Sequence, residues 1–233
     1  MNLWPRPIQQ PHPPVWVPGS GSISTFDFAV DNEVCYCFLS YSGAKAAKSM
    51  MDGYWKVVAD KGREPNPYRA GFLQLVAVAE TDSQAEEKYA RHVEYFYHKC
   101  LHWPIQLGSP PGNQDYRSMV ATLSNPVRRA EDAKKLRYRD FVEKGYVIAG
   151  SPATVRDRLK EEVVKGLHVG NLMVLLQIGS MPHELTLENI DLFARKVLPE
   201  LRGEWNDEAW VNHWWPEQLR GAVAKPATAG VGA

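Results

Sequence analysis

The sequence predicts a parallel α/β sheet covered by helices. Four apolar runs of strand length alternate with amphipathic segments whose apolar residues recur every three or four positions, and this alternation is typical of parallel α/β folds. The later runs are apolar on both faces, as strands buried between helices are. The 233 residues are enough for one (β/α)8 barrel, which takes roughly 200–250 residues. Only four strand–helix units are counted, so we predict a partial barrel.

The first two units follow a proline-rich start. Prolines recur throughout residues 4–14, and because each proline removes a backbone donor, this stretch is predicted to be an extended strap. A short strand over 15–17 and a helix over 23–31 come next. Residues 34–39 form the second predicted strand, and the helix over 44–61 carries its apolar side chains on one stripe.

The third unit is followed by a long insertion. Its strand is predicted over 71–80, and the helix after it carries Ser83 and Glu86 at the spacing of a capping box. Residues 102–126 are rich in Gly, Pro, Ser and Asn and are predicted to be a loop. A charged helix is expected over 127–144.

The fourth unit completes the predicted sheet. Ser151 and Pro152 have the residue types of an N-cap and a first helical position, so a helix is predicted to start there. A strand over 172–178 and a helix over 184–201 follow. The side chains predicted to face inward from this last helix are Leu187, Ile190, Ala194, Val197 and Leu201.

The tail over residues 203–233 has a different composition. Trp205, Trp210, Trp214 and Trp215 lie close together in an acidic segment, and an Ala/Gly/Val-rich end follows. We expect a strap that covers an exposed edge of the sheet, followed by a disordered end. The alternative is a partner-binding patch, because clustered tryptophans are typical of interfaces.

The charge balance and the cysteine count exclude several classes of function. Lys plus Arg equals Asp plus Glu at 27 each, so there is no basic field to attract nucleic acid or an anionic membrane surface. No apolar run approaches the roughly 18 residues of a membrane span, and residues 1–15 do not have the apolar core of a signal peptide. Three cysteines are too few for a disulfide framework. We therefore expect a soluble, cytoplasmic protein.

Two sets of side chains have spacings that metal ligands can also have. Cys35 and Cys37 would lie on the same face of a strand, and His98 and His102 would lie one turn apart on a helix. Neither pair has a second pair or an acidic ligand at the required spacing. We predict that the cysteines are small buried apolar residues, that the histidines are structural and that no metal is bound.

The candidate ligand-binding segment is Gly19-Ser20-Gly21-Ser22. It follows an apolar strand and precedes a helix, which in a parallel α/β fold places it at the face where ligands bind. Glycines let the backbone approach an anion, the helix start directs N–H groups toward it, and Ser20 and Ser22 add hydroxyl donors. The pattern is neither a Walker loop nor a dinucleotide fingerprint, so it predicts a site for one phosphate, with an ordinary turn as the alternative.

His183 is the candidate acid–base residue. It also follows a predicted strand and precedes a helix, so it is expected at the mouth of the same face, where it can serve as a hydrogen-bond donor or a proton carrier. A purely structural role at the start of the helix is the alternative. No Gly-x-Ser-x-Gly elbow is present, which excludes the usual serine hydrolase arrangement.

Several segments together resemble the bacterial luciferase-like, flavin-dependent monooxygenases. They occur in the family's order, span about residues 2–202, and begin in the middle of the family's pattern. The segments are Trp4-Pro5-Arg6-Pro7, Gln10-Pro11-His12-Pro13-Pro14-Val15-Trp16-Val17-Pro18-Gly19-Ser20-Gly21-Ser22, Val78-Ala79-Glu80-Thr81-Asp82, Gly150-Ser151-Pro152-Ala153-Thr154-Val155, Gly179-Ser180-Met181-Pro182-His183-Glu184 and Leu192-Phe193-Ala194-Arg195-Lys196-Val197-Leu198-Pro199.

The resemblance implies a (β/α)8 barrel that binds FMN, or the deazaflavin F420, at the carboxyl-terminal ends of its strands. It also implies that the flavin phosphate rests on Gly19, Ser20, Gly21 and Ser22. Reduced flavin and oxygen would then place one oxygen atom on a small organic substrate. Because only four units are present, residues 1–202 are expected to form the carboxyl-terminal half of such a barrel, which is about four strand–helix units.

Three functions are therefore carried forward. The first is a flavin-dependent monooxygenase that uses reduced flavin and oxygen and retains the phosphate loop, with its substrate unspecified. The second is a catalytically silent fragment or assembly partner, which forms a homo-oligomer through exposed barrel edges or pairs with a separate amino-terminal half. The third is a small α/β protein that binds a phosphate ligand without redox chemistry.

Overall fold

The structure is a computed structural model of the chain. It describes residues 8–9, 12, 14–19, 21–39, 41–101, 116, 120 and 135–205. The predicted loop over 102–126, apart from two isolated residues, the first part of the helix predicted over 127–144, and the tail beyond 205 lie outside the described residues. So do Ser20 and His102.

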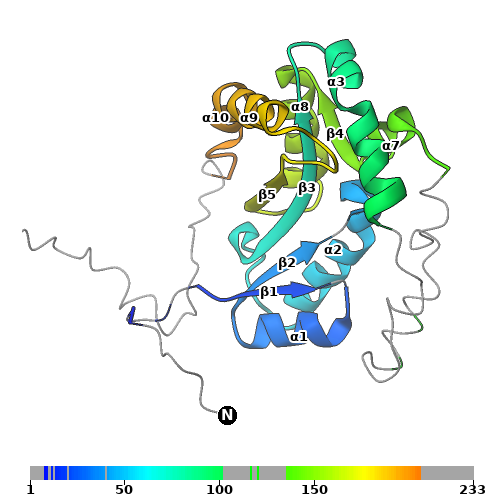
Figure 1. The fold of residues 1–233 in the computed structure, drawn as a ribbon. Coiled ribbons are helices and arrows are strands. Elements are labelled where there is room, and N and C mark those ends of the chain that lie inside the picture. The colour runs from blue at the N-terminus through cyan, green and yellow to red at the C-terminus, as the bar shows by residue number, and fades with distance from the viewer. Residues whose placement is uncertain are drawn as a thin grey trace, which may run out of the picture.

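Strands and helices alternate along the described chain (Figure 1). The strands are β1 (Trp16–Gly19), β2 (Cys35–Leu39), β3 (Ala70–Val78), β4 (Val147–Gly150) and β5 (Asn171–Leu175). The helices are α1 (Ile23–Asp31), α2 (Gly43–Asp60), α3 (Asp82–Tyr95), α7 (Tyr138–Glu143), α8 (Pro152–Arg158), α9 (His183–Leu192) and α10 (Leu198–Leu201). A 3-10 turn, η1 (Pro67–Arg69), precedes β3, and the π-helical segments η2 (Phe96–Cys100), η4 (Leu159–Lys165) and η5 (Phe193–Val197) continue α3, α8 and α9.

All pairings in the sheet are parallel, and β3 makes three of them. Gly71 of β3 is paired with β2 and with β5, so these two strands lie on opposite edges of β3. Leu75 is paired with β4 and with β5, so β4 lies on the same edge of β3 as β2, further along the strand. The order across the sheet is therefore β1, β2, β3, β5, with β1 and β5 as the outermost described strands, and the short β4 pairs with β3 alone, beyond the end of β2.

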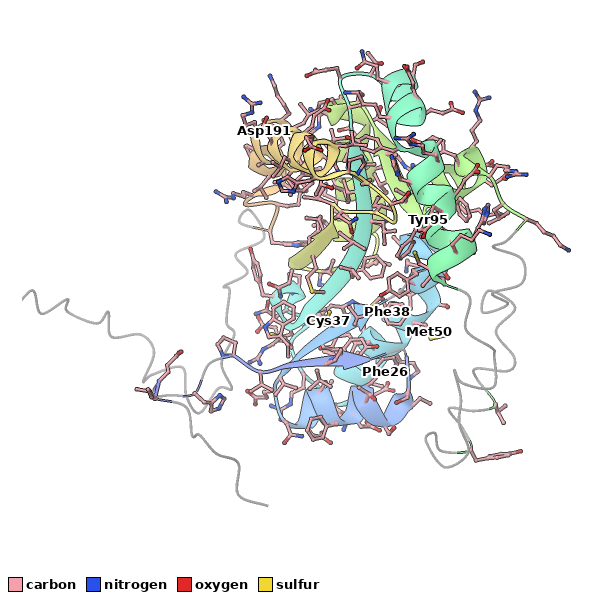
Figure 2. The ribbon with its side chains drawn as sticks, viewed as in Figure 1. Phe26, Cys37, Phe38, Met50, Tyr95 and Asp191 are labelled. Atoms are coloured by element: carbon pink, nitrogen blue, oxygen red, sulfur yellow. The ribbon has the colours of Figure 1, made fainter. Side chains whose placement is uncertain are left out.

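One hydrophobic core lies between the sheet and the helices α1, α2 and α8. Phe26 of α1 meets Tyr36 of β2 edge to face, with ring centroids 5.1 Å apart, and Tyr36 stacks on Tyr54 of α2 at 4.9 Å. Phe38 and Phe72 extend this aromatic layer to β3 (Figure 2). Burial of these large rings contributes favourable free energy to the packing of α1 and α2 on the sheet.

A second core lies under α3 and α7, against β4 and the carboxyl-terminal half of β3. Its largest fully buried side chains include Tyr89, Tyr97 and Phe141. Tyr97 stacks on Phe141 at 4.3 Å, and its hydroxyl donates a hydrogen bond to the carbonyl of Tyr41 at 2.7 Å. The segment after α3 is thereby tied both to α7 and to the turn after β2.

The parallel α/β class and the four predicted strands are confirmed. The helix predicted over 23–31 has those bounds, and the Ser151 side chain caps α8 by accepting from the N–H of Thr154, with Pro152 first in the helix. β4 is an additional short strand, whose four residues directly precede the Ser151 cap. Of the helix predicted over 127–144, the described part contains only α7.

The predicted capping box at Ser83 and Glu86 is wrong. α3 begins at Asp82, and its N-cap is Thr81, whose backbone is extended and whose Oγ1 accepts a hydrogen bond from the N–H of Gln84 at 3.2 Å. Ser83 already lies inside the helix, where its side chain cannot cap the first turn.

The inward face predicted for the last helix is also largely wrong. Leu187 is 51% exposed and Ile190 is 41% exposed, and Ala194 is exposed as well. Only Val197 is fully buried as expected, while Leu201 is half-buried. The buried positions on α9 and η5 include Leu192 and Phe193. A polar residue occupies the centre of the contact between α9 and the sheet, and the π-helical turn η5 shifts the buried side of the helix after it.

That polar residue is Asn189, which is completely buried. Its Oδ1 accepts from the N–H of Val78 at 2.7 Å, and its Nδ2 donates to the carbonyls of Val76 and Leu176 at 3.0 and 2.8 Å. The amide therefore satisfies backbone groups at the end of β3 and just after β5. Buried backbone groups need such partners, because leaving them unpaired is costly.

We predict that Asn189→Ala destabilises the protein by about 3 kcal/mol, because the substitution leaves three buried backbone groups without their partner. Urea unfolding followed by circular dichroism measures the change. The matched control is Asn32→Ala, since Asn32 is exposed and makes one hydrogen bond, to the carbonyl of Phe28 at 2.8 Å. Equal losses in the two variants would contradict the role assigned to Asn189.

Candidate functional site

The turn between β1 and α1 contains the described part of the predicted anion loop. Gly19 is the last residue of β1, Gly21 lies in the turn and Ser22 is the N-cap residue of α1. Because β1 ends here and α1 starts immediately afterwards, the turn lies at the carboxyl-terminal end of the parallel strands. This is the rim at which α/β proteins bind ligands.

Close packing accounts for both described glycines. A Cβ atom on Gly19 would lie 2.6 Å from Cε2 of Tyr36, and one on Gly21 would lie 2.5 Å from Sδ of Met50. Gly21 also has a φ of +99°, which residues with a side chain rarely adopt. Both glycines are therefore required by the packing of the turn against Tyr36 and Met50, and Gly21 also by its backbone conformation.

Ser22 caps α1. Its Oγ accepts a hydrogen bond from the N–H of Thr25 at 3.2 Å and lies 2.7 Å from Oγ1 of Thr25. The N–H groups of Thr25 and Phe26 also donate to the carbonyl of Ser22. Helix geometry leaves the N–H groups of Ile23 and Ser24 directed out of the helix end. Together with the partial positive charge of that end, these two groups are what α1 offers to an anion.

His183 lies on the same rim but at the other edge of the sheet. It is the first residue of α9 and is exposed. α9 follows β5, and both β2 and β3 lie between β5 and β1. Three strand spacings of about 4.8 Å separate the two edge strands by roughly 14 Å. The chain therefore does not bring His183 beside Gly19 and Ser22, and its role at the mouth remains a prediction.

A carboxylate that sequence reasoning did not single out connects two turns of this rim. Asp82 follows β3, and its Oδ1 accepts from the N–H of Ser151 at 2.6 Å, while its Oδ2 accepts from Oγ1 of Thr154 at 3.2 Å. These hydrogen bonds, chiefly the one from the Ser151 backbone, lower the pKa of Asp82. A Cβ on Gly150 would meet the Asp82 carboxylate at 2.5 Å, so the glycine allows this contact.

A buried histidine lies near the segment between β5 and α9. His92 of α3 is 3% exposed, and its Nδ1 lies 2.9 Å from Oγ of Ser180. Arg91 donates from Nε to Nε2 of His92 at 3.0 Å, so Nε2 acts as an acceptor and the ring is neutral. Desolvation, together with the Arg91 charge, lowers the pKa of His92. The pairing joins residues 88 positions apart, which no local pattern could reveal.

The two cysteines and His98 make contacts within the fold, whereas His102 lies outside the described residues. Cys35 and Cys37 are buried free thiols on β2, and they contact the carbonyl of Tyr68 and Sδ of Met173. His98 donates from Nε2 to the carbonyl of Leu136 at 2.9 Å. Over the described part of the chain, no group of three or more His, Cys, Asp or Glu side chains is placed to hold a metal ion. None of the helices in that part is long and apolar enough to cross a membrane.

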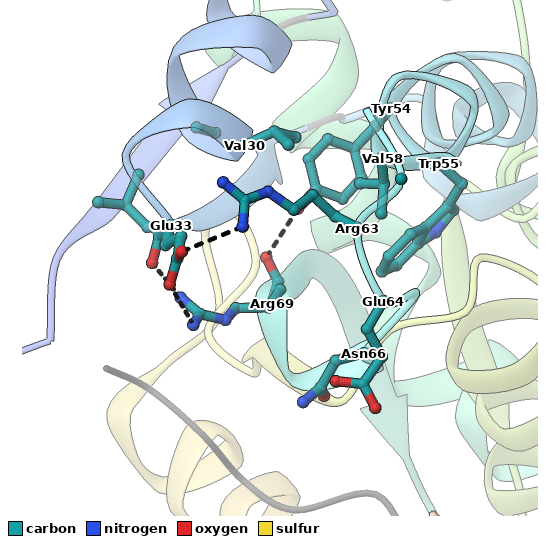
Figure 3. Close-up of a pocket in the computed structure, with 12 residues that line it drawn as sticks. Val30, Glu33, Tyr54, Trp55, Val58, Arg63, Glu64, Asn66 and Arg69 are labelled. Carbon is teal, nitrogen blue, oxygen red and sulfur yellow. Dashed lines mark hydrogen bonds and ion pairs between the residues drawn. The ribbon is translucent and has the colours of Figure 1, made fainter. Parts of the chain in front are cut away.

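A separate cavity of about 280 Å³ lies at the opposite end of the strands (Figure 3). Tyr54 and Val58 of α2 line its apolar side, and Glu33, Arg63 and Arg69 line its charged side. Both arginines form ion pairs with Glu33, and because Glu64 also lines the cavity, its two positive and two negative charges balance. Residues just before β2 and β3 form part of the wall of the cavity. The cavity and the candidate anion loop therefore lie at opposite ends of the strands.

We predict that Asp82→Asn destabilises the protein by about 1 kcal/mol at pH 7, a value reduced for the exposure of the carboxylate. Because the folded-state pKa of Asp82 lies below its unfolded value, the stabilisation is complete above the unfolded pKa and is lost as the pH falls through the folded one. The difference between wild type and variant should therefore shrink below about pH 4. Thermal unfolding across pH measures it.

Asp60→Asn is the control for this prediction. Asp60 is exposed and pairs with Lys56 of its own helix at 2.6 Å, so its replacement should leave stability nearly unchanged. A difference between wild type and Asp82→Asn that stays constant down to pH 2 would show that the carboxylate does not provide the stabilisation.

Comparisons with known proteins agree with this fold. A family model described as luciferase-like monooxygenase matches residues 1–168. A monooxygenase, RslO1, from Streptomyces bottropensis is 17% identical with a TM-score of 0.55, and the match covers 84% of this chain and 50% of that one. The oxygenating constituent of 3,6-diketocamphane monooxygenase from the CAM plasmid of Pseudomonas putida, in complex with FMN, is 18% identical with a TM-score of 0.56, covering 81% and 49%.

The chain thus spans about half the length of the solved structures that it resembles. The family match covers most of the chain, including the candidate anion loop, the sheet as far as β4 and helix α8. The parallel sheet and its helices correspond to part of a (β/α)8 barrel. The chain belongs to the family of luciferase-like monooxygenases.

Proposed function

We propose that this chain is part of a flavin-dependent monooxygenase and that the turn from Gly19 to Ser22 holds the phosphate of FMN. The observation that carries the proposal is the position of this turn, which lies at the carboxyl-terminal end of β1 and leads directly into the N–H groups at the start of α1. A phosphate is the anion best matched to a helix start with free N–H groups. FMN is supported as the cofactor by the similar structure that is described as a complex with FMN.

The residues of the turn fit a flavin phosphate. Gly19 and Gly21 let the turn pack closely against Tyr36 and Met50, and the N–H groups of Ile23 and Ser24 provide donors for an anion. Ser22 holds these donors in place, because its hydroxyl caps α1 by a hydrogen bond from the N–H of Thr25. When bound, reduced flavin supplies the reaction with oxygen, and the protein's part is to bind, orient and exclude water.

A second proposed function is that of an assembly partner. The observation that favours it is that β1 and β5, the edge strands among those described, each pair with one neighbour. Exposed parallel edges attract further strands, so the partial barrel is suited to association with another copy or with an amino-terminal half.

The free thiols of all three cysteines agree with a reducing, cytoplasmic location.

The first test measures FMN binding to the purified chain and to Gly21→Ala. We expect the alanine to weaken binding by roughly tenfold, because the positive φ and the contact with Met50 force the turn to move, at a cost of 1–2 kcal/mol. Gly62→Ala is the matched control, since Gly62 also has a positive φ (+64°) but has no atom within 4 Å of its Cβ position. Equal affinities of wild type and Gly21→Ala would contradict the assigned site.

The choice of ligand separates the remaining alternatives. Riboflavin lacks the phosphate, so we expect it to bind more weakly than FMN by at least about tenfold if charge-assisted hydrogen bonds hold the phosphate. Binding of F420 in preference to FMN would change the cofactor and leave the site in place. Binding of inorganic phosphate without either flavin would favour a non-redox phosphate binder, and absence of all binding would refute the proposal.

A further inference from the structure

We propose that the tryptophan-rich segment over residues 206–215, which lies outside the described residues, folds back on its own chain and places the Trp210 side chain in the cavity beside α1 and α2. The proposal joins two features that the proposed function leaves unused, the cavity and the cluster of tryptophans. It concerns the end of the strands opposite the candidate anion loop and does not depend on flavin binding.

The start of this segment is fixed beside the cavity. Trp205 is 5% exposed, and its Nε1 donates a hydrogen bond to the carbonyl of Val169 at 3.0 Å. Its ring meets the ring of His168 edge to face at 4.9 Å, and His168 meets Trp55 in the same way at 4.8 Å. Trp55 lines the cavity. A single side chain, His168, therefore separates the last described residue from the cavity wall.

Two ion pairs hold the same point of the chain. The Glu204 carboxylate lies 2.9 Å from Nζ of Lys160 and 3.1 Å from Nζ of Lys165, and its side chain is only 10% exposed. Segments near a chain end are poorly ordered unless contacts tie them down. Because Glu204 and Trp205 are tied down in this way, the segment that follows leaves the fold at a defined place next to the cavity.

Trp210 is within reach of the cavity. It follows Trp205 by five residues, and five extended residues span up to roughly 17 Å. The two successive ring contacts from Trp205 to Trp55 are each shorter than 5 Å. Trp210 is also the first tryptophan after Trp205, so it reaches the cavity with the shortest connecting loop.

The cavity has the size and the walls for an aromatic side chain. Its volume is about 280 Å³, whereas an apolar cavity of about 150 Å³ already holds benzene. Tyr54, Trp55 and Val58 of α2 provide apolar and aromatic surface, and Arg63 lies across from them (Figure 3). Burying an indole ring against such a surface is favourable, because it removes apolar area from water.

The charges of the cavity favour a neutral occupant. Its two arginines and two glutamates balance, so the wall has no excess charge to attract an ion. An indole ring is neutral and has one N–H donor, for which the Glu64 carboxylate on the wall is an acceptor. The Arg63 side chain is 48% exposed, and its ion pair with Glu33 is long at 3.4 Å. Its guanidinium can therefore turn to stack on the indole face.

The first experiment is fluorine NMR on the full chain, with its eight tryptophans replaced by 5-fluorotryptophan. Trp210→Phe identifies the Trp210 resonance, which we expect to be protected from a soluble paramagnetic probe. Arg63→Ala should shift that resonance. Lys56→Ala is the matched control and should not, since Lys56 lies on α2 outside the set of lining residues. A Trp210 resonance that the probe broadens fully, or that Arg63→Ala leaves unchanged, would overturn the inference.

The second experiment measures the binding of free indole by calorimetry. Trp210→Ala should open the cavity, so we expect this variant to bind one indole at least roughly tenfold more tightly than the wild-type chain does. Trp215→Ala is the matched control and should bind indole as weakly as wild type. Equal binding by wild type and Trp210→Ala would show that the cavity is a small-molecule site that Trp210 does not fill.

Dilution distinguishes the chain's own segment from that of a second copy. Protection of Trp210 that is independent of protein concentration supports docking within one chain. Protection that is lost on dilution would assign the cavity to the segment of a second copy and overturn the inference. Because none of these measurements uses flavin, their outcome is separate from that of the FMN test.

Discussion

The hydrogen bonding of β3 is the constraint on which the rest of the structure depends. This one strand bonds to β2 and β4 along one edge and to β5 along the other, so three of the four pairings of the sheet pass through it. Its nine residues are long enough to serve two neighbours in succession on the same edge. Eight of the nine are buried, which gives the strand apolar contacts with both cores. Parallel strands need such cover on both faces.

The carboxyl-terminal end of β3 organises the functional rim. Asn189 bonds to the backbone of β3 at Val76 and Val78, which fixes the last helix against the strand. A few residues later Asp82 bonds to Ser151, which fixes the turn after β4. These polar contacts join the ends of β3 and β4 and the segment after β5, whereas the described part of the glycine turn after β1 is held by the Ser22 cap on α1. The hydrogen-bonded part of the rim and the candidate anion loop are therefore formed by different strands.

Local chemistry made the repeating elements predictable. The stretch from Ile23 to Asp31 becomes the helix that its pattern predicts, and Ser151 caps α8 because a serine followed by proline favours a helix start. Long-range pairs were not predictable in this way. His92 meets Ser180, and Asp82 meets Ser151, only because β3, β4 and β5 are neighbours in the sheet.

Patterns were weakest where tertiary contacts compete with periodicity. Leu187 and Ile190 have the spacing of an inward face, yet Asn189 takes the buried position between them because it makes two hydrogen bonds to the backbone of β3 and one to the backbone just after β5. At Ser83, a capping pair with the right spacing is unused because Thr81 starts the helix two residues earlier. At both places the local sequence is compatible with more than one arrangement, and the observed arrangement is the one that gives the whole fold the lower free energy.

The sequence by itself determined the class of fold, the alternation of its elements, the glycine turn after β1 and the resemblance to the luciferase-like family. These depend on residue types and spacings within a few turns of helix or a few strand residues. The tertiary structure alone decided that the turn and His183 lie at opposite edges of the sheet. It also decided that β3 has three partners and that β1 and β5 are edges among the described strands. Strand order is set by packing between segments far apart in the chain, and no local periodicity encodes it.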